Sequence, residues 1–432
     1  MNDPAGEPNP LQGLLGDLLK VIGASSAGGT AWLDAARSLA VGVATDGQPE
    51  ANPDPLQRIR LQELARVAEL HIADLTGYVP GSGRHAVTVT PVGRGTYALR
   101  VLDAWRPVLQ EMVGAQEAGP TVPGASGGLF GDLGAGGMQD LLGRFATTMG
   151  PVLLGMQFGS AAGHLAQRSL GQYALPLPWP ESDELLVVPQ NVTAFAEDWS
   201  LPPDETLLWA CVRELATHTV LSRPHVADRM TELLQAAGRQ AVAVQQELAD
   251  RLGGAGDPDA LQRLMADPES LLADLLTPGQ HHVSQQLTAL ATTIGSYVDH
   301  VTSLVATSLT GSAAALGEAW YRFRIEDGKG EQAAGALFGL ELGREQVDRG
   351  AAFVRGVVER AGDGGLARLW ERPRNLPTPA EVDAPGLWLE RIDLPDDELT
   401  GGGAHGDGLD PGTGPDAEPS GNDDTGPGPA GA

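Results

Sequence analysis

The residues with the clearest chemical spacing lie on a predicted helix over residues 207–220. Apolar residues recur at helical spacing between Trp209 and Ala216, and the same stretch contains the run Arg213-Glu214-Leu215-Ala216-Thr217-His218. This run has the spacing of a His-Glu-x-x-His zinc helix, in which two imidazoles four residues apart lie on one face and bind the metal. The glutamate of such a helix is a general base toward metal-bound water. Glu214 keeps that position, whereas Arg213 and Thr217 stand where the histidines would be.

Three longer stretches around this helix carry a family resemblance. Residues 159–178 (GSAAGHLAQRSLGQYALPLP), 185–205 (LLVVPQNVTAFAEDWSLPPDE) and 339–392, together with the helix itself, resemble actinobacterial members of the zincin-like metallopeptidase type 2 family. The resemblance covers roughly residues 11–392. In that family a third zinc ligand, a glutamate, comes from a downstream helix in a Glu-Gly-Tyr-x-Asp-His context. The matching stretch here begins Gly295-Ser296-Tyr297 and ends Asp299-His300, so the glutamate position is Gly295.

The resemblance implies a fold and an activity. The expected fold is mainly α (α+β), a zincin-like helical domain with a small β element before the zinc helix. Family members are zinc-dependent metalloproteases, and the strand at residues 185–188 would be the edge strand that aligns a bound peptide. The resemblance also places Tyr297 near the cleft.

This chain departs from the family at all three ligand positions, Arg213, Thr217 and Gly295. Catalytic zinc needs three protein ligands and a water, and these residue types supply none of the usual donors. We therefore expect a protein without a cofactor, in which Glu214 is a vestigial general base and Arg213 pairs with Glu214 or Asp299. The function that follows is that of a pseudo-peptidase, a binding or scaffolding protein with a peptide or protein partner.

A second hypothesis keeps the hydrolase activity by moving the metal. Glu214 and His218 are also four residues apart, and Asp299 or His300 could complete a set of three ligands. This pair lies about 100° around the helix from the original one, so its use requires a helix rotation. A third hypothesis is an interaction protein that acts through its acidic tail and its groove and is unrelated to peptidase ancestry.

Hydrophobic periodicity predicts the elements that position these residues. Strands are expected at residues 87–92 and 185–188, and residues 373–385 are expected to form an irregular, proline-rich return. In residues 141–170, Gly155, Gly159 and Gly163 recur every four positions, which indicates a buried helix that approaches a neighbour closely rather than a membrane span. The other predicted helices cover residues 11–22, 31–43, 56–75, 97–113, 225–252, 261–276, 283–308 and 341–359.

Composition limits the partners and the compartment. The net charge of −28 argues against nucleic acid and anionic lipid surfaces, and no stable membrane insertion is expected. The single cysteine, Cys211, cannot form an internal disulfide, and no leader peptide is evident, so a cytoplasmic location is predicted. We divide the chain into a disordered arm (residues 1–10), the zincin-like domain (11–392) and a disordered acidic tail (393–432), which has ten acidic residues and no lysine or arginine.

Overall fold

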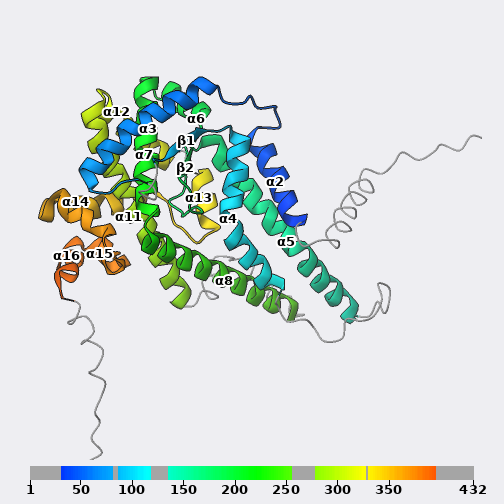
Figure 1. Ribbon diagram of the computed structural model, residues 1–432. Helices are drawn as coiled ribbons and strands as arrows, with labels where there is room; N and C mark the ends of the chain where they lie inside the picture. Colours follow the sequence, from blue (N-terminus) through cyan, green and yellow to red (C-terminus); the bar gives the residue numbers. More distant parts are fainter. Residues whose placement is uncertain (1–30, 81–85, 118–134, 255–277, 327–328, 396–432) are drawn as a thin grey trace, which may run out of the picture.

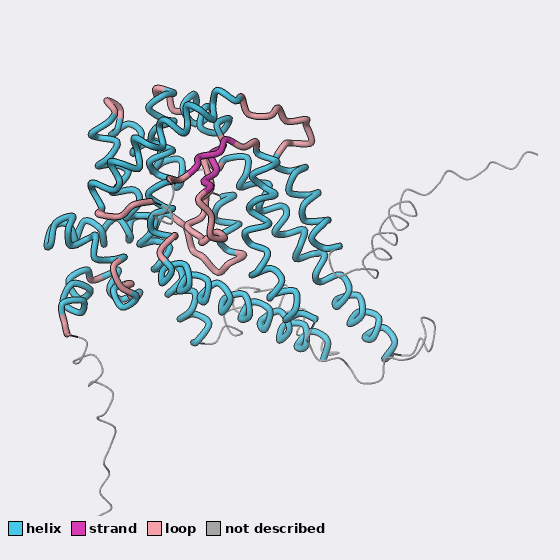
Figure 2. Tube along the Cα trace, in the orientation of Figure 1, coloured by secondary structure: helices cyan, strands magenta, loops and turns pink. Residues whose placement is uncertain are grey.

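The computed structural model describes residues 31–80, 86–117, 135–254, 278–326 and 329–395. It is a mainly helical molecule with one two-stranded sheet, as the sequence predicts (Figures 1 and 2). The described elements are α2 (Ala31–Ala44), α3 (Pro55–Thr76), β1 (Thr88–Pro91), α4 (Arg94–Glu117), α5 (Ala135–Arg168), β2 (Glu184–Val187), α6 (Pro189–Asp198), α7 (Pro203–Leu221), α8 (Pro224–Gly254), α11 (Pro278–Leu309), α12 (Ala313–Glu326), α13 (Lys329–Ala336), α14 (Arg344–Ala367), the 3₁₀ turns η1 (Arg368–Trp370) and η2 (Pro373–Asn375), α15 (Pro379–Asp383) and α16 (Pro385–Asp393).

Helix α7 lies in the middle of the molecule, packed against α3, α6, α11 and β2 (Figure 1). Every residue from Trp209 to Leu221 is buried, including Cys211, because the helix carries apolar residues around most of its circumference. Asp204 and Glu205 lie in its first turn, where acidic groups favour the positive end of the helix dipole. The polar residues of α7 are therefore buried too and need partners inside the protein.

The sheet is small, and its outer edges are closed by the protein itself. Strands β1 and β2 pair in parallel, with Val89 opposite Leu185. On the far edge of β1, Gln62 of α3 donates to the Val87 carbonyl (3.0 Å) and accepts from the Val89 amide (3.1 Å), while Glu69 accepts from the Val87 amide (2.9 Å).

The far edge of β2 is covered by the segment that precedes it. The Gln172 amide donates to the Leu186 carbonyl, and the Val188 amide donates to the Leu170 carbonyl, each at 2.9 Å. The Gln172 side chain accepts from the Leu186 amide at 3.2 Å. The expectation of an edge strand open to a peptide at residues 185–188 is therefore wrong, because residues 170–172 already occupy that edge.

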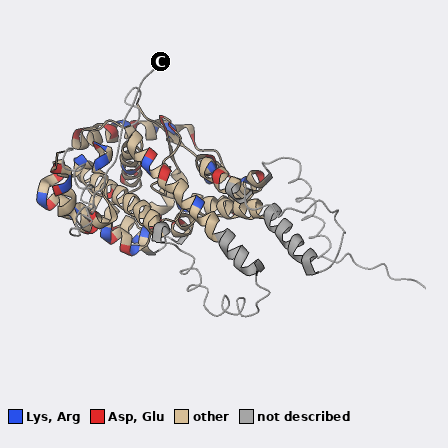
Figure 3. Cartoon of the chain, turned by 90° about the horizontal axis from the view of Figure 1, so that it is seen from below, with Lys and Arg blue, Asp and Glu red and all other residues tan. Residues whose placement is uncertain are grey.

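Glycines at every fourth position of α5 let it approach α2 closely. A Cβ on Gly155 would stand 2.6 Å from the Trp32 carbonyl oxygen, and one on Gly159 would overlap the Ala36 carbonyl. The prediction of a close helix contact is confirmed. None of the helices in the described ranges is long and apolar enough to cross a membrane. Acidic and basic side chains are interspersed over those helices (Figure 3).

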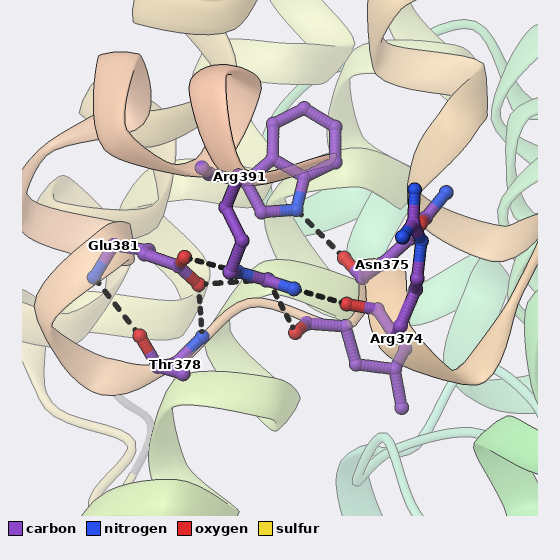
Figure 4. Close-up of polar contacts among 7 residues, drawn as sticks. Arg374, Asn375, Thr378, Glu381 and Arg391 are labelled. Carbon is purple, nitrogen blue, oxygen red and sulfur yellow. Dashed lines mark hydrogen bonds and ion pairs between the residues drawn. The ribbon is translucent and has the colours of Figure 1, made fainter. Parts of the chain in front are cut away.

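The C-terminal part is more ordered than the proline-rich sequence predicts. Residues 373–385 form η2 and α15 instead of an irregular return, because prolines begin short helices and Thr378 forms a capping box with Glu381. Arg391 ties this region together, as Figure 4 shows: it bonds to the Glu381 carboxylate and to the carbonyls of Arg374 and Leu376.

Other predictions differ from the structure in where a helix begins, omit a helix, or concern residues outside the described ranges. Helix α14 begins at Arg344 rather than at residue 341, and α6, α12 and α13 were not predicted. The predicted arm at residues 1–10, the helices at 11–22 and 261–276, and the acidic tail beyond residue 395 lie outside the described residues.

Candidate functional site

The three positions at which the sequence analysis expects the family's zinc ligands, Arg213, Thr217 and Gly295, line one cavity. Arg213 and Thr217 reach it from α7, and Gly295 reaches it from α11. The cavity has a volume of ≈ 40 Å³, and Trp320 and Arg324 of α12 and Glu331 of α13 also line it. Residues from α7 and from the consecutive helices α11, α12 and α13 therefore meet where the resemblance predicts the metal centre.

Arg213 is held in this cavity by an ion pair. Its Nη1 donates to Oδ1 of Asp299 at 2.7 Å, and Nη1 of Arg324 donates to Oδ2 of the same carboxylate at 2.7 Å. The guanidinium of Arg213 lies 4.2 Å from the ring centroid of Trp320, within the range of a cation–π contact. Asp299 is thus the partner of Arg213, one of the two that the sequence suggested.

Thr217 and Gly295 offer no side-chain donor to the cavity. The Thr217 hydroxyl donates to the Arg213 carbonyl at 2.9 Å, the usual contact of a threonine with the preceding helical turn. A Cβ on Gly295 would have Arg324 Nη2 as its nearest neighbour, at 3.7 Å. A side chain at position 295 would therefore begin in ordinary van der Waals contact with the guanidinium of Arg324.

Glu214 is bound to the backbone of residues 171–173. Its Oε2 accepts from the Tyr173 amide at 2.8 Å, and a Cβ on Gly171 would come within 2.6 Å of its side chain, so this approach depends on glycine. Burial raises the pKa of Glu214 to about 7, although the Tyr173 amide and the charge of Arg213 act in the opposite direction. A carboxyl with this pKa could exchange a proton near neutral pH.

His218 lies one turn further along α7 and contacts Tyr173 as well. The Tyr173 hydroxyl and His218 Nδ1 are 2.8 Å apart. Burial lowers the pKa of His218 to about 4, and the nearby charge of Asp183 only partly compensates. At neutral pH His218 is therefore an uncharged imidazole in a hydrogen-bonded pair with a buried tyrosine.

The residues of the relocated metal site are engaged with other partners. Asp299 bonds to the two arginines, and His300 Nε2 bonds to Asp363 Oδ1 at 2.7 Å. Within the described ranges, no group of three or more His, Cys, Asp or Glu side chains is arranged to hold a metal ion. Tyr297 does not line the cavity: it packs edge-to-face on Trp370, with ring centroids 5.3 Å apart.

Comparison with known proteins places this chain in a family. Residues 32–389 match the sequence profile of the zincin-like metallopeptidases. The chain belongs to the zincin-like metallopeptidase family. A structure from Chloroflexus aurantiacus, provisionally described as a hydrolase with a novel fold, superposes with a TM-score of 0.58 at 22% identity. It covers 84% of this chain and 99% of its own, which establishes a shared fold. No curated protein matches.

The zincin-like site of this chain does not fit a zinc ion. A guanidinium has no lone pair to coordinate, the Thr217 hydroxyl is bonded to the helix backbone, and Gly295 has no side chain. A fixed cation 4 Å from a dication would also cost about 8 kcal/mol at an effective dielectric of 20. The side chains at these three positions therefore present none of the usual zinc ligands to the cavity.

Sequence reasoning missed three residues of this zincin-like site. Arg324 and Trp320 lie on a helix that was not predicted, and Tyr173 lies in the loop before β2. The run Trp320-Tyr-Arg-Phe-Arg324 was a usable signal, because aromatic residues interleaved with arginines favour cation–π contacts. No spacing within the sequence connects this run to Arg213.

Proposed function

We propose that this protein is a non-catalytic member of the zincin-like metallopeptidase family that works as a binding or scaffolding protein. The observation that carries the proposal is the position of Arg213. Its guanidinium lies in the cavity formed by the three former ligand positions and pairs there with Asp299 at 2.7 Å. On this proposal, one positive charge of the protein takes the place that the family gives to a metal ion.

The closed sheet supports the same function. In zincins a substrate peptide extends a strand of the sheet, and strand addition needs a row of free backbone groups. Here Gln62 and Glu69 occupy one edge and residues 170–172 occupy the other. A peptide could bind in this mode only after those contacts break.

Metal content and peptidase activity of the untagged protein test the proposal together. After dialysis against zinc, the purified protein is expected to contain well under 0.1 zinc per chain and to leave a fluorogenic casein substrate intact. Stoichiometric zinc that is lost in Glu214→Gln or His218→Ala would overturn the proposal and favour the relocated metal site.

Restoring the ligands tests the assignment of the site. We expect the triple variant Arg213→His, Thr217→His and Gly295→Glu to bind zinc weakly, because Arg324 remains beside position 295 and would pair with the new glutamate. Adding Arg324→Ala should increase zinc affinity further, by tenfold or more. Equal zinc content in the triple and quadruple variants would show that Arg324 does not block the site.

A further inference from the structure

Helix α3 has an apolar face that points to solvent. Four of its large apolar side chains are exposed: Leu56 by 70%, Ile59 by 59%, Val67 by 39% and Leu70 by 66%. At about 100° per residue, these four positions and Glu63 lie within about 80° of one another around the helix axis. We call these five residues the α3 stripe. A contiguous exposed apolar patch of this kind marks an interaction surface.

The opposite face of α3 already provides its contact with the core. Leu61, Ala65, Ala68 and Ile72 are buried and lie about 180° around the helix from the α3 stripe. Helix α3 packs on α7, β1 and α11, and Figure 1 shows it lying across α7. A helix that is apolar on two faces is typical of a helix packed on both sides. Within the described residues, however, no element buries the α3 stripe.

The α3 stripe and the residues beside it are symmetric about Glu63. Positions at equal distances on either side carry the same kind of side chain: Leu56 and Leu70, Ile59 and Val67, and Arg60 and Arg66. A two-fold axis at Glu63 exchanges these positions between two antiparallel helices, so each apolar residue of the stripe faces an apolar residue of a second copy. A different partner gives no reason for this symmetry. The face is therefore complementary to itself.

The charges beside the α3 stripe favour the same pairing. Arg60 and Arg66 flank the stripe on opposite sides, and Arg60 pairs there with Asp204 of α7. In an antiparallel pair each Glu63 lies one helical turn from Arg60 and Arg66 of the second copy, and charges beside an apolar seam set partner choice and orientation. The exposed charged residues of α3 are three arginines and two acids, although the whole chain has a net charge of −28. Two copies can therefore meet at this face without the general repulsion between acidic surfaces.

We propose that two copies of this protein associate through α3, antiparallel about a two-fold axis at Glu63. Leu56 of one copy then packs on Leu70 of the other, and Ile59 packs on Val67. The paired segment, residues 56–70, is about 21 Å long at 1.5 Å per residue. A contact of that length is smaller than a standard interface of about 800 Å² per partner, so the dimer is reversible, with a dissociation constant of about 10–100 µM. Because the stripe is on the face of α3 turned away from α7, the dimer does not depend on what the Arg213 cavity binds.

Sedimentation equilibrium of the full-length protein, between about 2 and 300 µM, tests the proposal. Wild type should pass from monomer to dimer over this range. Leu70→Arg should raise the dissociation constant at least tenfold, because each dimer loses two contacts with Leu56 and gains positive charge near Arg60 of the second copy. Leu387→Arg on α16, where the side chain is 54% exposed, should leave the constant unchanged. Circular dichroism should show that both variants fold. A wild type that stays monomeric throughout, or two variants that behave alike, would overturn the proposal.

Cysteine cross-linking tests the antiparallel orientation. In the proposed dimer, position 56 lies opposite position 70 of the second copy and about 21 Å from its own equivalent, whereas a disulfide joins Cα atoms about 4.4–6.8 Å apart. Under mild oxidation, Leu56→Cys alone and Leu70→Cys alone should therefore give no covalent dimer on a denaturing gel, and an equal mixture of the two should give one. The native Cys211 is buried, so it does not compete. If Leu56→Cys alone cross-links as well as the mixture does, or if the mixture does not cross-link, the proposed pairing is wrong.

Discussion

Replacing Asp299 with alanine should destabilise the protein far more than removing a comparable carboxylate at the surface. Asp299 bonds to Arg213, whose side chain is 9% exposed, and to Arg324, which is 20% exposed. Removing one partner of a buried ion pair costs about 3–5 kcal/mol, because a charge is left without compensation. The Asp299 side chain is itself 31% exposed, so water reduces this cost, and we expect about 2–3 kcal/mol.

Asp103 offers a matched control. It also bridges two arginines, Arg37 at 2.5 Å and Arg106 at 3.4 Å, but all three side chains are between 35% and 46% exposed. Exposed ion pairs contribute roughly 0–1 kcal/mol, so Asp103→Ala should change the free energy of unfolding by less than about 1 kcal/mol.

Urea unfolding at pH 7, followed by circular dichroism, measures both variants. The denaturation midpoint should fall clearly for Asp299→Ala and little for Asp103→Ala, with similar slopes. Adding Arg213→Met to Asp299→Ala should recover part of the loss, because the uncompensated cation is then absent. Equal effects of the two aspartate variants, within about 0.5 kcal/mol, would refute the view that Asp299 holds a buried charge.

Further expectations concern packing, pH and the C-terminal region. Gly159→Ala should destabilise by about 1–3 kcal/mol, because its Cβ overlaps α2, whereas Gly42→Ala, which meets nothing within 4 Å, should be neutral or stabilising in thermal unfolding. The folded pKa of Glu214 is raised from 4.5 to about 7, so its ionisation removes stability as pH rises through that window. Relative to wild type, the free energy of unfolding of Glu214→Gln should therefore be higher at pH 8 than at pH 4.5. A difference between the two proteins that does not change with pH would contradict this. His218 has the opposite sign, since its pKa is lowered from 6.5 to about 4, and the stability tied to its neutral form is lost as pH falls through that window. Arg391→Ala should lower the free energy of unfolding by about 2–4 kcal/mol, because Glu381 and two backbone carbonyls lose their hydrogen-bond donors. Limited proteolysis of this variant should cleave the C-terminal helices first. An unchanged digestion pattern would show that Arg391 is dispensable.

The sequence predicted the fold wherever a signal was local. Apolar periodicity located α3, α4, α5, α7, α8 and α11, and the glycines of α5 predicted its close contact with a neighbour. It missed short elements that begin with proline, such as α6 and α15, because a single proline is compatible with a turn, a coil or the first turn of a helix.

The sequence also determined what the site lacks. In any fold a guanidinium has no lone pair to offer a metal and a glycine has no side chain, so Arg213 and Gly295 cannot act as side-chain ligands. Their arrangement around one cavity followed from the family resemblance, and the structure places all three there.

Only the tertiary structure decided which side chains pair around Arg213 and what covers the edges of the sheet. Arg324 meets Asp299 from a separate helix, and Gln62 of α3 closes the edge of β1. The reason is physical: periodicity reports which residues share a face of one helix or strand, whereas an ion pair or a capped strand edge depends on how separate elements pack.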